Sequence, residues 1–60
     1  MAGKFELFTN KAGKYQFRLK ASNGQVIAQS QAYSSKRSAI EGIESVKNHA
    51  PEAEVVEVDE

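Results

Sequence analysis

Polar and hydrophobic residues alternate over residues 14–21, the stretch KYQFRLKA. A period of two is typical of a strand with one buried face and one solvent-facing face. We therefore predict a strand over residues 14–21. The segments KFELFT, residues 4–9, and QVIAQSQ, residues 25–31, predict strands on either side of it.

Two turn signals determine how these strands should pair. Asn23-Gly24 favours a two-residue type I′ turn, in which both central residues have positive φ. Asn10 before Lys11-Ala12-Gly13 favours a three-residue loop with Gly13 in the left-handed conformation. Both turns select the same buried face, which strengthens the assignment. The expected pairs are Phe5 with Leu19, Leu7 with Phe17, Thr9 with Tyr15, Ala21 with Val26, Leu19 with Ala28 and Phe17 with Ser30.

The opposite face of the predicted sheet is mostly polar. Glu6 falls opposite Arg18 there, as an oppositely charged cross-strand pair. Phe8 and Ile27 are the exceptions to its polarity, and they are either covered by long polar side chains or part of a partner-binding surface. The whole face comprises Lys4, Glu6, Phe8, Gln16, Arg18, Lys20, Ile27, Gln29 and Gln31.

A helix is predicted over residues 35–49, because Ala39, Ile40, Ile43, Val46 and Ala50 follow the spacing of one apolar stripe. Ser34 or Ser35 can cap its start, and Pro51 ends it. Gly42 lies inside this helix, where glycine costs about 1 kcal/mol relative to alanine. We expect close packing against the sheet, rather than a hinge, to be the reason for this glycine.

Residues 54–59 return to a valine-rich pattern that predicts a fourth strand. The expected fold is a single α+β domain over residues 1–60 with the order β-β-β-α-β. In this fold an antiparallel meander is covered by one helix.

The length of 60 residues limits the core, because a chain this short buries only about 60% of the surface that its unfolded form exposes. The chain has no cysteine for a disulfide, and one histidine cannot complete a zinc shell. Oligomerisation is the remaining support for so small a domain. No apolar run approaches the roughly 20 residues of a membrane span, and no signal-peptide pattern is present, so we expect a cytoplasmic protein.

Charge is distributed unevenly along the chain, although the formal net charge is zero. Residues 1–49 hold all eight Lys and Arg residues against Glu6, Glu41 and Glu44. Residues 50–60, here called the acidic segment, hold five acidic residues and no basic one. The basic part could attract nucleic acid or another polyanion, but the acidic segment would compete for it.

The stretch FRLKASNGQVIAQSQAYSSKRSAIEGIESVKNHAP resembles the small bacterial YegP-like family, whose function is uncharacterised. The resemblance rests on the strand 17–21, the Asn23-Gly24 turn, the stretch 33–36 and the helical stretch 42–47. Members often carry glycine where this chain has Ala32, and a tryptophan or other aromatic residue near Tyr15. These departures leave the expected fold unchanged.

The resemblance implies a β-β-β-α-β unit that occurs either twice in tandem or as two chains. For a chain with one unit it implies a homodimer, in which the C-terminal strands are exchanged to form one continuous sheet. The acidic segment would then lie against the partner's basic part. The family implies no activity, substrate or cofactor.

Candidates for catalysis are few, and we expect no enzyme, no cofactor and no metal site. His49 falls in the last helical turn, where a cation favours the helix terminus. Glu41 and Glu44 face outward, with Arg37 and Lys47 within reach along the helix. A structural or solvated role accounts for each of these residues.

Two binding hypotheses remain. Ser34, Ser35, Lys36 and Arg37 combine hydroxyls, cations and free N–H groups at a helix start, as a phosphate or sulfate site would. The favoured alternative is that serine caps the helix, Arg37 pairs with Glu41 and Lys36 is solvated. The outward sheet face could bind nucleic acid through its cations and one aromatic ring, with Lys4, Phe8, Arg18 and Lys20 as the candidate residues. The favoured interpretation is a non-catalytic, dimer-forming protein with a binding or structural role.

Overall fold

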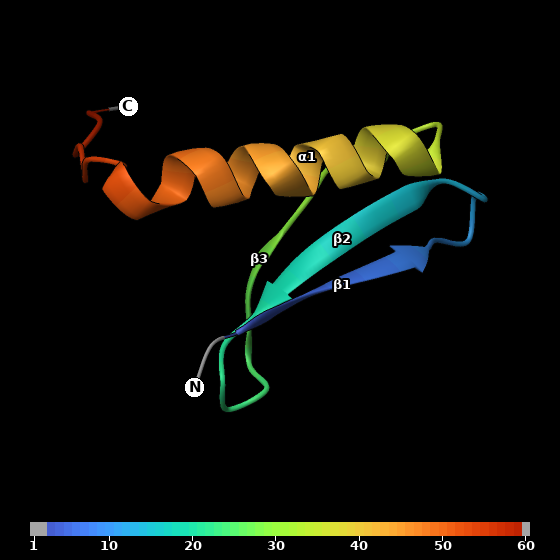
Figure 1. The fold of residues 1–60 in the computed structure, drawn as a ribbon, viewed down its shortest axis with the longest axis horizontal. Coiled ribbons are helices and arrows are strands. Elements are labelled where there is room, and N and C mark those ends of the chain that lie inside the picture. The colour runs from blue at the N-terminus through green and yellow to red at the C-terminus, as the bar shows by residue number, and fades with distance from the viewer. Residues whose placement is uncertain (1–2, 60) are drawn as a thin grey trace.

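The computed structural model describes residues 3–59, which form a three-stranded sheet with one helix on one of its faces (Figure 1). The elements are β1 (Lys4–Thr9), β2 (Tyr15–Lys20), β3 (Val26–Gln29), α1 (Lys36–His49) and a 3-10 turn, η1 (Ala50–Glu52). The strands are antiparallel in the order β1-β2-β3. The predicted α+β architecture of an antiparallel meander with one helix is therefore confirmed.

The first hairpin has the predicted turn and register. Gly13 has a φ of 80° and donates its N–H to the Asn10 carbonyl over 3.0 Å. The Asn10 side-chain oxygen accepts from the N–H groups of Ala12 and Lys14 at 2.9 and 3.0 Å, so one asparagine organises the loop. The strands then pair as expected, with Phe5 opposite Leu19, Leu7 opposite Phe17 and Thr9 opposite Tyr15.

The second hairpin does not have the predicted type I′ turn, so that prediction is wrong. Gly24 has a φ of 89°, but Asn23 has none of the positive φ that a type I′ turn requires. The loop instead has three residues, closed by a hydrogen bond from Ala21 N to Gln25 O at 2.8 Å. The Asn23 side-chain oxygen accepts from Gln25 N at 3.0 Å, which favours this turn over the mirror-image one.

The longer loop shifts the register of β2 and β3 by one residue near the turn. Lys20, not Ala21, lies opposite Val26, so that predicted pair is wrong. One extra residue, Ile27, then stands between the partners of Lys20 and Leu19, as in a β-bulge. The bulge restores the predicted pairing of Leu19 with Ala28. The extra residue in the loop and the extra residue in the bulge thus compensate for each other, and the centre of the sheet keeps the predicted register.

Pairing beyond β3 continues to the start of the helix. Ser30 donates its backbone N–H to the Phe17 carbonyl at 2.8 Å, and its hydroxyl accepts from Phe17 N at 2.9 Å. Tyr15 and Tyr33 then exchange two backbone hydrogen bonds of 2.8 and 2.7 Å. These contacts attach the connection to α1 firmly to the N-terminal end of β2.

The helix begins and ends as the sequence indicates. Ser35 is the N-cap, and its hydroxyl accepts from Ser38 N at 3.1 Å. The α-helix ends at His49, and Pro51 lies in the 3-10 turn that follows. His49 Nδ1 donates a hydrogen bond to the Ser45 carbonyl oxygen at 2.8 Å, which is a structural role at the helix terminus.

The core is centred on Phe17, whose side chain is 7% exposed. The Phe5 ring meets it edge-on at 5.8 Å, and the Tyr33 ring stacks on it at 6.2 Å. Gly42 of α1 packs on the same rings. A Cβ added there would lie 2.5 Å from the Tyr33 hydroxyl and 3.1 Å from Phe17 Cε2. Close packing, as predicted, is the reason for a glycine inside this helix.

Residues 53–59 form no strand within the single chain. Val55 is fully exposed, and Val56 and Val58 are about two-thirds exposed. The predicted strand over residues 54–59 needs a sheet edge to pair with, and the chain directs this segment away from its own sheet (Figure 1). The fourth strand therefore stays a prediction for an assembly of more than one chain.

We predict that Gly42→Ala lowers the free energy of unfolding by about 1–3 kcal/mol, because the added methyl group clashes with Tyr33 and Phe17. Helix propensity alone predicts the opposite sign, a gain of about 1 kcal/mol. Urea unfolding followed by circular dichroism measures the difference. Tyr33→Phe removes the nearest atom, so the cost of Gly42→Ala should be smaller in that background. A Gly42→Ala protein more stable than the original would contradict the packing explanation.

Candidate functional site

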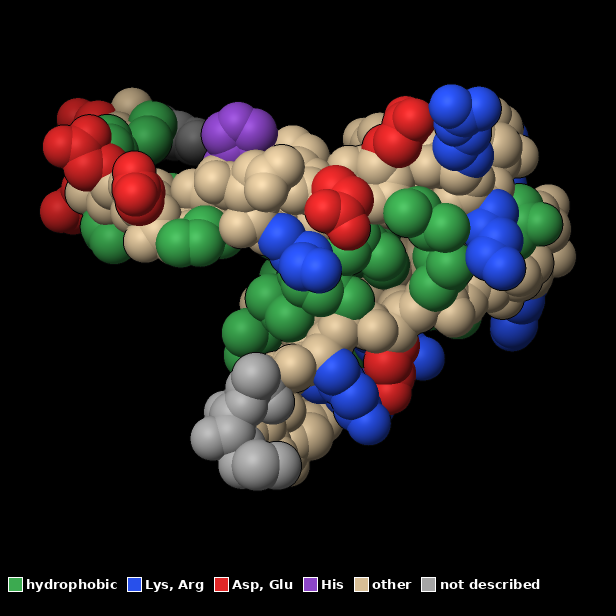
Figure 2. All heavy atoms as spheres, viewed as in Figure 1, with side chains coloured by type: hydrophobic (Ala, Val, Ile, Leu, Met, Phe, Trp, Pro, Cys, Tyr) green, Lys and Arg blue, Asp and Glu red, His purple; other side chains and the backbone are tan. Residues whose placement is uncertain are grey.

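An apolar hollow of about 400 Å³ lies between the sheet and the second half of α1. It exists because α1 contacts β2 near the helix start and then diverges from the sheet toward its own C-terminal end (Figure 1). Figure 2 shows it as a notch beneath the end of the helix, edged by hydrophobic side chains. We call it the groove. Its lining residues are Phe5, Phe17, Leu19, Ala28, Gln29, Ser30, Gln31, Tyr33, Gly42, Ser45 and Val46.

The groove exposes the face of the sheet that the sequence predicts to be buried. Phe17 is buried, but Phe5 and Leu19 are only half-buried. Every residue of β3 is exposed, including Ala28, which lines the groove. Apolar surface that is left uncovered beside an exposed sheet edge is typical of a site that binds another polypeptide.

The sequence identifies most of the groove residues but not the groove itself. Hydrophobic periodicity assigns Phe5, Phe17 and Leu19 to one face correctly. It does not show that the helix leaves part of that face uncovered, because the angle between helix and sheet depends on packing around Gly42. The signal in the sequence that could have indicated an uncovered surface is the length of 60 residues, which predicts a small core.

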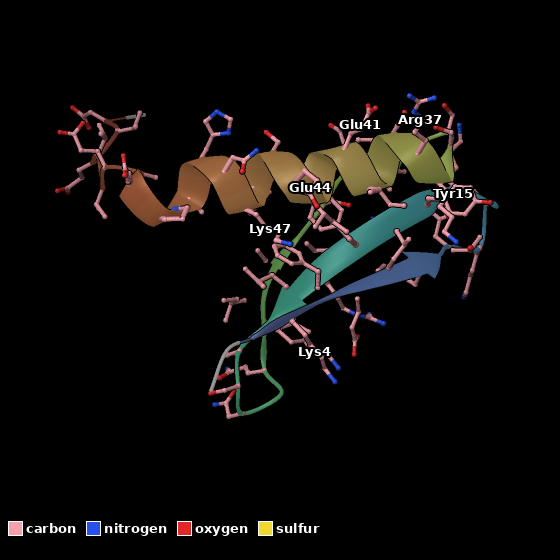
Figure 3. The ribbon with its side chains drawn as sticks, in the orientation of Figure 1. Lys4, Tyr15, Arg37, Glu41, Glu44 and Lys47 are labelled. Carbon is pink, nitrogen blue, oxygen red and sulfur yellow. The ribbon has the colours of Figure 1, made fainter. Side chains whose placement is uncertain are left out.

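The outward face of the sheet, the candidate nucleic-acid surface, is organised around Glu6. The predicted cross-strand pair is confirmed, because Arg18 Nε donates to Glu6 Oε1 at 2.9 Å. Lys20 Nζ lies 3.4 Å from the same oxygen, and Lys4 Nζ lies 4.0 Å from Oε2. Figure 3 shows Lys4 on the side of the sheet away from the helix. Hydrogen bonds from Arg18 outweigh desolvation and, with Lys20, hold the pKa of Glu6 below its ordinary value.

Phe8, the aromatic candidate on this face, is covered by a neighbour. The Arg18 guanidinium carbon lies 4.4 Å from the centre of the Phe8 ring, in a cation–π contact. Long polar side chains thus cover Phe8, which was one of the two expectations for it. A nucleic-acid base could stack on that side of the ring only after displacing Arg18.

The candidate anion site at the helix start uses most of its groups internally. The Ser35 hydroxyl caps the helix, and Arg37 Nε lies 3.5 Å from Glu41 Oε2. Figure 3 shows Arg37 and Glu41 on the side of α1 away from the sheet. Ser34 is exposed. Lys36 takes a different position, on the wall of a second, smaller hollow of about 240 Å³ with Leu7, Phe8, Thr9 and Tyr15.

Chemistry-bearing side chains remain dispersed in the described part of the chain. Glu44 Oε2 lies 3.9 Å from Lys47 Nζ on the exposed side of the helix. Within residues 3–59 no three His, Asp or Glu side chains come together as metal ligands would. None of the helices in that range has the length and apolar character needed to cross a membrane.

Comparison with known proteins identifies the family. Residues 10–57 match the model of DUF1508, a domain of unknown function. A UPF0339 protein of Treponema denticola is 59% identical over 58 residues, covering 97% of this chain and 100% of the relative. The UPF0339 protein YegP of Escherichia coli is 46% identical over 54 residues, covering 90% of this chain but 49% of the relative.

Solved structures agree with this assignment. A Haloferax volcanii protein determined by solution NMR is 45% identical with a TM-score of 0.85, covering 95% of this chain and 97% of that one. An Agrobacterium tumefaciens protein determined by the same method is 47% identical with a TM-score of 0.79, covering 92% and 89%. The chain belongs to the DUF1508 family, as the YegP-like resemblance predicts, and the function of this family is unknown.

We predict that Glu6 makes the free energy of unfolding decrease at acid pH. Because its pKa is lowered in the folded state, the stabilisation is complete above the unfolded pKa and is lost in the acid range, as pH falls through the lower folded value. Glu6→Gln should flatten the fall in unfolding free energy over that range. Urea titrations at a series of pH values measure it.

The matched control for this prediction is Glu44→Gln, which removes an exposed helical pair with Lys47. This variant should keep the acid-dependent slope of the original protein. A Glu6→Gln protein with an unchanged slope would show that the Glu6 cluster does not stabilise the fold.

Proposed function

We propose that this member of the family is a non-catalytic homodimer in which the groove of each chain receives the valine-bearing segment of the other. The observation that carries the proposal is that the apolar groove stays open while Val55 is fully exposed and Val56 and Val58 are largely exposed. Each chain thus has both an uncovered apolar surface and an apolar segment with nothing to cover it.

The exposed area of the single chain supports a second copy. The chain exposes 5036 Å², whereas a compact monomer of 6.6 kDa exposes about 3,900 Å². The excess of about 1,100 Å² is comparable to the roughly 800 Å² that each partner buries in a standard stable interface. Its radius of gyration of 12.9 Å likewise exceeds the roughly 10 Å of a compact domain of this length.

Alternation along residues 54–59 gives the segment one suitable face. In an extended strand Val56 and Val58 point to one side, while Val55, Glu57 and Asp59 point to the other. Valine also favours strands, and the exposed β3 offers unpaired backbone groups at the sheet edge. A strand added at a sheet edge, with Val56 and Val58 toward the groove, accounts for both features.

The length of some relatives supports the same arrangement. Escherichia coli YegP has about twice the length that this chain matches, which leaves room for a second unit in one polypeptide. The family resemblance implies that two units complete each other, either in tandem or as two chains. A chain with one unit would achieve this by forming a homodimer.

The distribution of side chains supports a binding or structural role rather than catalysis. Glu41, Glu44 and His49 are exposed and Glu6 is half-buried, with the three glutamates next to cations and His49 at the helix terminus. Catalysis needs such groups to converge in a site. A cytoplasmic location remains part of the proposal.

We predict that the protein has the mass of two chains in solution. Light scattering coupled to size-exclusion chromatography measures it at micromolar concentration. The expected mass is about twice the 6.6 kDa of the chain. A single-chain mass at that concentration would overturn the proposed homodimer.

We predict that the dimer depends on Val56 and Val58. Replacing both with serine should weaken association and lower the melting temperature, because two apolar side chains lose their buried site. Deleting residues 53–60 should have a larger effect than loss of an unbound segment.

Val55→Ser is the matched control, because alternation places Val55 on the opposite side of the segment. It should change association and melting much less than the double replacement. If all three variants melt and associate like the original protein, the segment does not occupy the groove.

A further inference from the structure

The two ends of the molecule carry opposite charge. Figure 2 shows Asp and Glu side chains gathered at the end that holds the acidic segment, and Lys and Arg side chains at the far end. Four residues, Lys11, Lys14, Lys36 and Arg37, form what we call the basic end. We propose that the basic end of each copy holds the acidic segment of the other, so that ionic strength controls dimerisation. This inference rests on the proposed homodimer.

The fold brings the basic end together from two separate segments. Lys11 and Lys14 lie in the β1–β2 loop, and Lys36 begins α1. The paired backbone hydrogen bonds between Tyr15 and Tyr33 hold these two segments side by side. The charge density is therefore a product of the tertiary structure and not of a run in the sequence.

Most of these charges have no partner within the part of the chain that the structure describes. Over residues 3–59 the ion pairs join Glu6 with Lys4, Arg18 and Lys20, Arg37 with Glu41, and Lys47 with Glu44. None involves Lys11, Lys14 or Lys36, and none involves the four described carboxylates of the acidic segment. Those carboxylates are Glu52, Glu54, Glu57 and Asp59.

Lys36 is exposed at the start of α1, where a carboxylate of the partner chain can pair with it. It lies on the wall of the 240 Å³ hollow beside Leu7, Phe8 and Tyr15. Glu57 and Asp59 alternate with Val58, so they point away from the groove when Val58 faces it, which leaves both carboxylates free to meet Lys36. No acidic side chain occupies the first turn of α1, so the helix terminus adds to the positive potential there.

The acidic segment is long enough to run along much of a partner chain. Residues 53–59 in an extended strand span up to about 23 Å, against a longest dimension of 34 Å for the chain. In a two-fold dimer each contact occurs twice, so the acidic segment of each copy meets the basic end of its partner at the same time. The positive charge of each basic end is then neutralised by the negative charge of the partner's acidic segment.

The consequence is a dimer with two distinct contributions to its stability. Contacts in the groove are apolar and are little affected by moderate salt. The exposed charges are screened over a Debye length of about 8 Å at physiological ionic strength, and over less at higher salt. Raising the salt concentration from about 50 mM to about 500 mM should therefore weaken the dimer several-fold.

Charge reversal tests the contact in the full chain, with analytical ultracentrifugation measuring the dissociation constant. Glu57→Lys with Asp59→Lys, or Lys14→Glu with Lys36→Glu, should each weaken dimerisation about tenfold at low salt. All four replacements in one chain should restore it, because each reversed segment then meets a reversed basic end. Circular dichroism checks that each variant is folded.

Two controls separate this contact from net charge. Glu41→Lys with Glu44→Lys changes the net charge as much as reversing the segment, but at exposed positions of α1 outside the acidic segment. It should weaken the dimer much less. Combining the reversed segment with Lys4→Glu and Lys47→Glu restores the net charge at the wrong places, and it should not restore association.

The possible results distinguish the ionic contact from the groove-mediated dimer on which it rests. A dimer whose dissociation constant is unchanged by salt and by both reversals would overturn the ionic contact and leave the groove-mediated dimer intact. A weakened dimer that the fourfold variant fails to restore, or that the misplaced charges restore equally well, would also overturn it. A monomer under all conditions would overturn the homodimer itself.

Discussion

The contact between Phe17 and the helix at Gly42 is the constraint on which the rest of this small structure depends. Phe17 lies at the centre of β2, with Phe5 and Tyr33 packed against its ring. The helix can approach these rings only where it has no side chain, at Gly42. Ala39, the buried residue of α1, lies one turn before this point of close approach.

That close approach also limits how much of the sheet one helix can cover. α1 is held against the N-terminal end of β2, where the Tyr15–Tyr33 hydrogen bonds and the Ser35 cap fix its start. From there it diverges from the sheet and leaves the groove open. Only Phe17 and Ala39 are buried apolar side chains in the described part of the chain, a core too small for most stable monomers. A second copy that fills the groove would supply the missing contacts.

Much of the fold is predictable from local signals because each of them has a single physical interpretation. Asn10 and Gly13 specify one loop, and the alternation of Tyr15, Phe17 and Leu19 specifies one register. Ser35 and Pro51 mark the ends of the helix in the same direct way. The Glu6–Arg18 pair follows from the register alone.

The second turn and the groove could not be predicted in this way. Asn23-Gly24 suits two kinds of turn, and the hydrogen bond that Gln25 N donates to the Asn23 side-chain oxygen favours the one with three residues. The bulge at Ile27 then compensates for the shift, so the sheet retains its predicted centre. The groove depends on the angle between helix and sheet, which arises from tertiary packing. A pattern of hydrophobic residues shows which face is apolar, but not how completely it is covered.

The most direct test of this account is an isotope-filtered NMR experiment on a mixture of labelled and unlabelled chains. It detects only contacts between protons on different molecules. If the two chains exchange their segments, the methyl groups of Val56 and Val58 give intermolecular contacts to the aromatic rings of Phe5 and Phe17. Valine methyl groups with no intermolecular contacts and the chemical shifts of an unstructured peptide would contradict it.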